Sequence, residues 1–280
     1  MANTEIKKLY NGEVEITFYV DSHRYKLAGE KSYLLSATAI TGIIDKSRVL
    51  INWAIGLTGS YLRKYLEEAS SNNFTSEELA PIIEEALNQH NQKREEAADT
   101  GSQVHDMAER IGMALKNNES IEDITKEISE MDSASKNPEL SEEEANKLQN
   151  VVNGITAFID WVVDHNVKFI ECERMVYSRK NKFVGTTDAI VEIDGKRYLI
   201  DYKTSKGVYS YMYYQVAGYT IAYEEETGIK LDGQMLIHFN KENGQFSVKD
   251  ITPEENAINQ ETFLHCLAVK QREKELNIYN

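Results

Sequence analysis

The stretch GTTDAIVEIDGKRYLIDYKTSKGVYSYMYYQVAGY, residues 185–219, decides the fold predicted for this chain of 280 residues. Asp194 and Gly195 in the middle of it form one of the strongest pairs for a two-residue hairpin turn. Apolar and β-branched residues on both sides predict antiparallel strands over residues 183–193 and 196–203. We therefore expect this hairpin to lie at the centre of a β-sheet.

Two acids and a lysine meet on the predicted hairpin. The pairing brings Asp188 near Asp201, and because side chains alternate along a strand, Asp201 and Lys203 face one side while Tyr202 faces the other. Asp201 directly follows an apolar run, where a carboxylate without a cation or hydrogen bonds would be costly. Gly185 permits a bulge or a close backbone approach beside Asp188. The group is a plausible seat for a hard divalent cation, which prefers oxygen ligands.

The remaining patterns predict an α/β fold, with a central mixed β-sheet flanked by helices, an N-terminal β-hairpin and an acidic helical elaboration. Expected strands are 14–20, 24–27, 168–177, 235–239 and 245–251. Expected helices are two within 36–69 with a break near 45–47, then 75–98, one starting at a capping box at Thr100, 141–165, 209–223, and one starting at Thr252. Residues 132–140 are the best candidate for a flexible surface segment.

We expect residues 1–280 to form a single domain. Its parts are an N-terminal hairpin and helical part over 1–166, which carries His105, a sheet core over 167–252, and a C-terminal helix over 253–280.

Composition indicates a folded protein, with 41% hydrophobic and 9% aromatic residues. The net charge of −15 at first sight opposes binding to nucleic acid. Residues 67–144, however, hold 21 acids against 6 basic residues, so the rest of the chain is neutral. This acidic region is interpreted as a solvated helical surface; a sharper hypothesis is that it repels DNA or docks a basic partner. Residues 179–206 are locally basic, which makes Arg179, Lys182 and Lys206 candidates for substrate binding.

Several classes of protein and site are excluded by what the sequence lacks. Residues 1–8 contain no apolar segment, so no signal peptide is expected. The charge-free run 207–223 contains six tyrosines and is too short for a membrane span. Cys172 and Cys266 form no CxxC pattern, which fits reduced thiols in a cytoplasm. Two cysteines also exclude a zinc ribbon and a four-cysteine iron-sulfur cluster.

Five ordered motifs carry a specific resemblance: TGSQVH at 100–105, ERMVYS at 173–178, GTTD at 185–188, DYKTS at 201–205 and QVAGY at 215–219. In order and spacing they resemble the PD-(D/E)xK nuclease superfamily, in its RecB-like or Cas4-like branch and particularly its phage-encoded exonuclease-like members. Residues 23–41 followed by Trp53 also look like the N-terminal part of those phage proteins. The resemblance covers about residues 23–223 and implies a restriction-endonuclease-like core. The iron-sulfur cysteines of Cas4 proteins are missing here.

The resemblance implies a role for each matching residue. Asp188, Asp201 and the backbone carbonyl of Tyr202 would bind Mg²⁺ or Mn²⁺, and His105 would be a further ligand carried on a helix. Glu173 would assist at a second metal or orient water, Lys203 would position or deprotonate the attacking water, and Gln215 and Tyr219 would support the site and contact substrate.

Simpler readings remain open for some of these residues. A histidine beside an apolar helix face is often a core residue, Glu171 competes with Glu173 for the role of the strand-borne acid, and most of the tyrosines of 209–223 are expected to pack in the core, although stacking on bases is possible.

Together these observations predict a metal-dependent deoxyribonuclease, and the resemblance implies that its products carry 5′-phosphates. Its expected mode is exonucleolytic, in phage DNA replication, recombination or degradation, and its expected partners are DNA and possibly a recombination or replication protein on the acidic region. The alternatives are a structure-specific or nicking endonuclease, and a non-catalytic DNA-binding or adaptor subunit that keeps the fold. The intact acids, lysine and glutamine argue against the adaptor.

Overall fold

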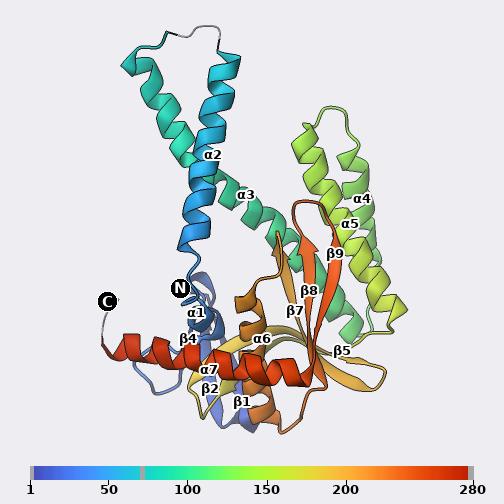
Figure 1. The fold of residues 1–280 in the computed structure, drawn as a ribbon. Coiled ribbons are helices and arrows are strands. Elements are labelled where there is room, and N and C mark those ends of the chain that lie inside the picture. Colours follow the sequence, from blue (N-terminus) through green and yellow to red (C-terminus); the bar gives the residue numbers. More distant parts are fainter. Residues whose placement is uncertain (1–2, 70–72, 277–280) are drawn as a thin grey trace. The chain divides into compact units, whose positions relative to one another are not determined.

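A mixed β-sheet of six strands is the centre of the larger part of the chain (Figure 1). The computed structural model describes residues 3–69 and 73–276 and, of residues 96–100, the backbone alone. β5, β6 and β7 are antiparallel neighbours, β7 and β8 are parallel, β9 is antiparallel to β8, and β4 runs parallel to the start of β6. The strands are β4 (Leu35–Ser36), β5 (Lys168–Ser178), β6 (Phe183–Ile193), β7 (Lys196–Ser205), β8 (Gly233–Asn240) and β9 (Phe246–Ile251).

The hairpin predicted from Asp194 and Gly195 is confirmed. Both residues have positive φ, 52° and 76°, as the tight two-residue turn requires. The parallel step from β7 to β8 needs a crossover, which is helix α6 (Ser210–Thr227). This crossover lays the tyrosine-rich segment against the sheet.

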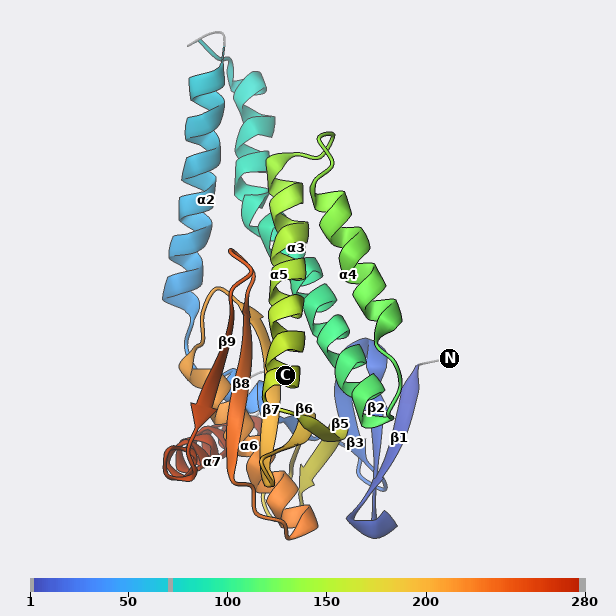
Figure 2. The same ribbon diagram turned by 90° about the vertical axis from the view of Figure 1, so that its right-hand side faces the viewer.

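Helices cover both faces of the sheet (Figure 2). On one face, the second part of α3 (Ser76–Lys116), α4 (Glu122–Ser135) and α5 (Glu142–Asp164) share a core with Phe169, Tyr202 and Phe239. On the other face lie α6 and α7 (Pro253–Glu275), and α1 (Ala37–Thr41) packs against both of these helices. The predicted α/β class with a helix-flanked mixed sheet is confirmed.

Most predicted element boundaries are confirmed by the caps. α5 begins with a capping box between Ser141 and Glu144, and α7 begins with one between Thr252 and Glu255, with proline at its start. The prediction of a flexible segment over residues 132–140 is only partly correct. Residues 122–135 form α4, which buries Ile124, Ile128 and Met131, so the expected flexible segment is reduced to the short loop before α5.

The N-terminal sheet has one strand more than the predicted hairpin. β2 (Val14–Tyr19) and β3 (Arg24–Leu27) match the hairpin, and β1 (Thr4–Leu9) pairs with β2. Short 3-10 turns follow β1 and β2, at Tyr10–Gly12 and Val20–Ser22. β1 is exposed over most of its length, so its sequence carries no apolar alternation that would have predicted it.

Two compact units make up the chain, residues 1–43 with 103–280 and residues 44–102. The smaller unit contains α2 (Ser47–Glu68) and the first part of α3, which starts at the predicted capping box between Thr75 and Glu78. The expected second start at Thr100 is wrong: the backbone of α3 continues through it, and the side chain of Thr100 lies outside the described residues. None of the helices in the described residues is long and apolar enough to span a membrane.

Candidate active site

The site forms where β6 and β7 separate. Their pairing ends at Ala189 and Ile200, so Asp188 and Asp201 are the first residues beyond the ladder. The Asp188 carboxylate accepts a hydrogen bond from the backbone N–H of Tyr202 and so occupies the place of the missing ladder partner. The predicted convergence of the two strands' acids at this point is therefore present.

Lys203 is buried beside Asp201. Its ammonium lies 2.5 Å from the Asp201 carboxylate, which is only 3% exposed. Tyr202 points to the opposite face, where its ring packs edge-on against Phe158 and His105, with centroids 5.5 Å apart in each case. The alternation predicted for these three consecutive residues is thus observed.

A chain of hydrogen bonds holds Lys203 from the side of α6. Its ammonium donates to Gln215 Oε1 at 3.0 Å. The Gln215 amide donates in turn to Tyr219 Oη at 2.6 Å and to Thr38 Oγ1, on α1, at 3.0 Å. Gly185 makes this arrangement possible, because a Cβ atom on it would meet Tyr219 Cε1 at 2.3 Å.

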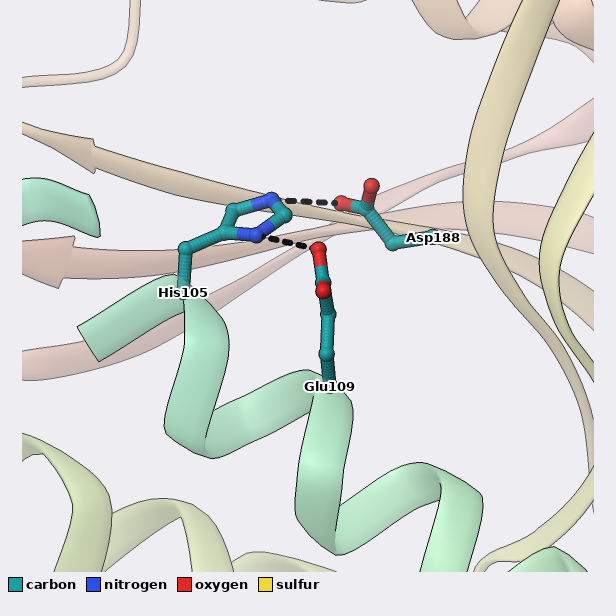
Figure 3. Close-up of side chains that lie close together, drawn as sticks. All are labelled: His105, Glu109 and Asp188. Carbon is teal, nitrogen blue, oxygen red and sulfur yellow. Dashed lines mark ion pairs between the residues drawn. The ribbon is translucent and has the colours of Figure 1, made fainter. Parts of the chain in front are cut away.

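His105 reaches the site from α3 (Figure 3). Its Nδ1 lies 2.6 Å from Glu109 Oε1, one turn further along the helix, and its Nε2 lies 3.5 Å from Asp188 Oδ2. One ligand atom from each of the three residues falls within 4.8 Å of the others. The imidazole is half-buried at the edge of the core, and its partners are carboxylates.

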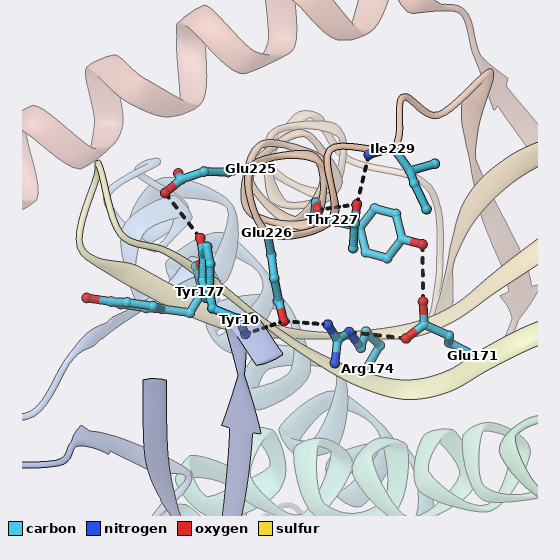
Figure 4. A network of polar contacts seen from close by, with 9 residues as sticks. Tyr10, Glu171, Arg174, Tyr177, Glu225, Glu226, Thr227 and Ile229 are labelled. Carbon is cyan, nitrogen blue, oxygen red and sulfur yellow. Dashed lines mark hydrogen bonds and ion pairs between the residues drawn. The ribbon is translucent and has the colours of Figure 1, made fainter. Parts of the chain in front are cut away.

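Glu173 and Glu171 have different surroundings although they stand two apart on β5. Glu173 has a positive φ of 49°, and its carboxyl group lies in the electrostatic field of Asp188 and Glu109. Glu171 instead accepts a hydrogen bond from Tyr223 at 3.1 Å and pairs with Arg174 at 3.2 Å (Figure 4). The irregular backbone thus turns Glu173 toward the acids, while Glu171 belongs to a separate polar network.

Crowded negative charge shifts the pKa values of this group. Burial, together with Asp188, raises the pKa of Asp201 to about 6 in spite of Lys203. Removal of the Glu173 carboxyl group from bulk water, with the charges of Asp188 and Glu109, raises its pKa to about 8, although the residue as a whole is exposed.

His105 and Lys203 also have raised pKa values, although burial alone would lower the pKa of a cationic group. Burial would lower the pKa of His105, but hydrogen bonds to Asp188 and Glu109 outweigh it and raise that pKa to about 10. Burial likewise opposes the charge of Lys203, and the neighbouring aspartates still raise its pKa. Both groups are therefore cations at neutral pH in the protein without metal.

A cavity of about 600 Å³ gives access to the group. Its walls come from the N-terminal sheet, α1, α3, β6, β7 and α6. The lining residues are His23, Tyr25, Ser36, Thr38, Ala39, His105, Gly185, Thr186, Asp188, Asp201, Tyr202, Lys203, Gln215 and Tyr219.

Three predicted substrate-binding residues are not among the residues that line this cavity in the described part of the chain. Arg179 pairs with Glu13 at 2.8 Å and lies over the ring of Tyr10, Lys182 lines a different cavity, and Lys206 pairs with Glu242 at 3.1 Å. Proximity in sequence to the hairpin did not bring them to the acids.

Two residues of the group were not singled out by the sequence. Glu109 stands four residues after His105, a spacing that places both on one helix face and was a usable signal. Thr38 lies 177 residues from Gln215 and has no local signature.

The donor set fits a divalent cation. Carboxylate oxygens suit Mg²⁺ and Mn²⁺, and the imidazole of His105 adds a nitrogen ligand that transition metals accept more readily than Mg²⁺ does. Glu109, Glu173, Asp188 and Asp201 bring four carboxyl groups together here, against the two cationic groups of His105 and Lys203. A divalent cation would neutralise the excess that raises the carboxyl pKa values.

Comparisons with known proteins identify the family of this chain. A family model described as the PD-(D/E)XK nuclease superfamily matches residues 75–275. No curated protein matches the chain. Among solved structures, a crystal structure of SSO0001 is similar at 16% identity, over 44% of this chain and 59% of that chain, with a TM-score of 0.28; the chain thus spans little more than half the length of that protein. With about 200 of its residues matched by the family model, this chain belongs to the PD-(D/E)XK nuclease superfamily.

Proposed function

We propose that this chain is a deoxyribonuclease that uses Mg²⁺ or Mn²⁺ to hydrolyse phosphodiester bonds from the end of a DNA strand. The observation that carries the proposal is the meeting of Asp188, Asp201 and Lys203 at the fork of β6 and β7, inside an accessible cavity. The Lys203 ammonium already has Asp201 and Gln215 as partners, and it also lines the cavity. In that position it can attract the negative charge of a phosphodiester.

In this proposal Asp188, Asp201, His105 and the backbone carbonyl of Tyr202 hold the metal, and Glu173 assists beside them. A bound divalent cation polarises a phosphoryl oxygen and lowers the pKa of a coordinated water. Lys203 lies 2.5 Å from the Asp201 carboxylate and donates to Gln215, a position from which it can offer a positive charge to the phosphate and position or deprotonate the attacking water.

Gln215 and Tyr219 act behind Lys203. The ammonium donates to the Gln215 oxygen, whose amide is held by Tyr219 and Thr38, so the cation keeps one position while substrate enters. Glu109 holds the other nitrogen of His105 and thereby fixes which nitrogen faces Asp188.

The size of the cavity supports action on a strand end. About 600 Å³ is the volume of a small-ligand site, and this open cavity is lined by residues between 23 and 39, by His105 and by residues between 185 and 219. A double helix with an intact partner strand is much wider than such a space, whereas a single terminal strand can enter it. This favours an exonuclease over an enzyme that cuts within continuous duplex.

The proposed setting is phage DNA replication, recombination or degradation in the host cytoplasm. The acidic region 67–144 carries a net negative charge, which disfavours contact with DNA and suits a basic protein partner. A basic recombination or replication protein is the proposed partner for the acidic region.

The test is digestion of linear duplex, closed circular and single-stranded DNA with Mg²⁺, Mn²⁺ or EDTA. We expect metal-dependent loss of the linear substrates and survival of the circles, with activity reduced at least a hundredfold in Asp201→Asn and Lys203→Ala. Lys196→Ala, an exposed lysine of the same strand, is the matched control and should retain full activity. Cutting of closed circles would replace the exonuclease by an endonuclease, and full activity of Asp201→Asn would refute the site.

A further inference from the structure

Tyrosines gather at the start of α6, beside the candidate site. Of the tyrosines in residues 209–223, Tyr219 and Tyr223 are buried and belong to the core. Tyr209 is different, because 45% of it is exposed directly before the first turn of the helix. Core packing therefore does not account for Tyr209.

The rings of Tyr209 and Tyr211 lie nearly parallel. Their centroids are 6.0 Å apart and their planes differ by 7°. Tyr209 is in an extended conformation, with φ −116° and ψ 154°, before the chain turns into the helix. Two residues apart across that junction, the side chains leave the backbone on the same side and present flat faces together.

The pair adjoins the catalytic group. Tyr211 stands one helical turn before Gln215 and two before Tyr219, so it continues the helix face that forms part of the cavity wall. The Tyr211 hydroxyl and the Lys203 ammonium interact electrostatically, which opposes the rise that burial causes in the pKa of Tyr211. Tyr209 and Tyr211 are not among the cavity-lining residues of the described chain, so they would meet the part of a bound strand that extends beyond Lys203.

We propose that Tyr209 and Tyr211 form a stacking platform for an unpaired base of the strand that enters the site, so that single-stranded DNA ends are the preferred substrate. The inference rests on the proposed function and names its substrate class. Stacking on an aromatic side chain stabilises a base of any sequence, and a base within a duplex already has its stacking partners. The platform therefore favours unpaired ends without selecting a sequence.

The binding test uses a fluorescently labelled oligothymidylate with Ca²⁺ in place of the catalytic metal. Tyr209→Leu and Tyr211→Leu should each weaken binding about tenfold, while Tyr209→Phe and Tyr211→Phe should bind like the unchanged protein because they keep the ring. Tyr33→Leu, which alters a tyrosine of similar exposure that lines another cavity, is the matched control and should not change binding.

The same variants are then compared in cleavage with Mg²⁺ or Mn²⁺. We expect the leucine variants to raise KM for single-stranded DNA with little change in kcat, and to affect blunt duplex at least fivefold less. Removing the base opposite the platform, by an abasic nucleotide near the end, should produce the same loss in the unchanged protein and no further loss in the variants.

Leucine variants that bind oligothymidylate normally, or phenylalanine variants that lose as much as leucine variants, would overturn the platform. Failure of the proposed function gives a different result, because the unchanged protein would then cleave no DNA. If only the platform is wrong, the unchanged protein still cleaves DNA and the leucine variants bind and cleave as it does.

Discussion

Gly185→Ala adds one methyl group, and we expect this substitution to disturb the site through the ring of Tyr219. Gly185 lies on β6 three residues before Asp188, and its Cα faces the ring of Tyr219. A Cβ atom there would lie 2.3 Å from Tyr219 Cε1 and 2.8 Å from Cδ1, whereas ordinary contacts begin at 3.4 Å. The ring or the strand must therefore move by about 1 Å.

The expected losses of stability and of cleavage rate both depend on the position of the Tyr219 ring, which accepts a hydrogen bond from Gln215. Overpacking of a filled core costs about 1–3 kcal/mol, which corresponds to a fall in Tm of roughly 2–10 °C for a unit of this size. A displacement of about 1 Å also strains the 2.6 Å hydrogen bond from Gln215 to Tyr219, and through Gln215 the position of Lys203. Misplacement of that size in a catalytic group costs on the order of a hundredfold in rate.

Thermal unfolding and steady-state cleavage of single-stranded DNA measure the two effects separately. Gly207→Ala is the matched control, because an added Cβ meets nothing within 4 Å there, and it should leave both Tm and rate unchanged. In the double variant with Tyr219→Leu the smaller side chain relieves the overlap, so the combined loss of stability should be less than the sum of the single losses. A Gly185→Ala protein with the Tm and rate of the unchanged protein would refute the close packing and the support assigned to Tyr219.

Two further predictions concern the acids around His105. Glu109→Gln should weaken Mn²⁺ binding about 10–100-fold, because it removes the charge that orients His105, whereas Asp106→Asn on the exposed side of the same helix should not; equal Mn²⁺ affinities in a titration would show that Glu109 has no such role. In EDTA, the stability against urea should fall as pH rises from about 6 to 10, because Glu173 and His105 have pKa values raised to about 8 and about 10 in the folded protein and lose their protonated, stabilising forms through that range. Saturating Mn²⁺ should flatten this fall, and a stability in EDTA that rises with pH would contradict the crowding of negative charge.

Sequence predicted best what local chemistry fixes. The turn at Asp194 and Gly195 requires positive φ at both residues, so the hairpin and the meeting of Asp188 with Asp201 followed from that one pair. The capping box at Thr252 equally fixed the start of α7. In each case the deciding atoms lie within a few residues of one another.

What sequence missed depends on distant packing or on a single backbone angle. Regular alternation puts Glu171 and Glu173 on one face, whereas the observed strand has a register shift just before Glu171 and a positive φ at Glu173. The capping pattern at Thr100 predicted the start of a helix, but α3 runs through this position without a break. Thr38 reaches Gln215 only because α1 packs on α6, a contact that no spacing in the sequence encodes.

The hydrogen bonds of Gln215 to Lys203, Tyr219 and Thr38 explain why Gln215 and Tyr219 stand four residues apart. A side-chain amide can turn either way, and only one way offers its oxygen to Lys203. Tyr219, four residues on and so on the same helix face, accepts from the amide nitrogen together with Thr38, and this leaves the oxygen for the ammonium. Because Lys203 has only 15% of its side chain exposed, a reversed amide would set two donors against a buried cation. The tyrosine therefore acts on the lysine through the glutamine, and that explains why a residue outside the charged group belongs to its motif.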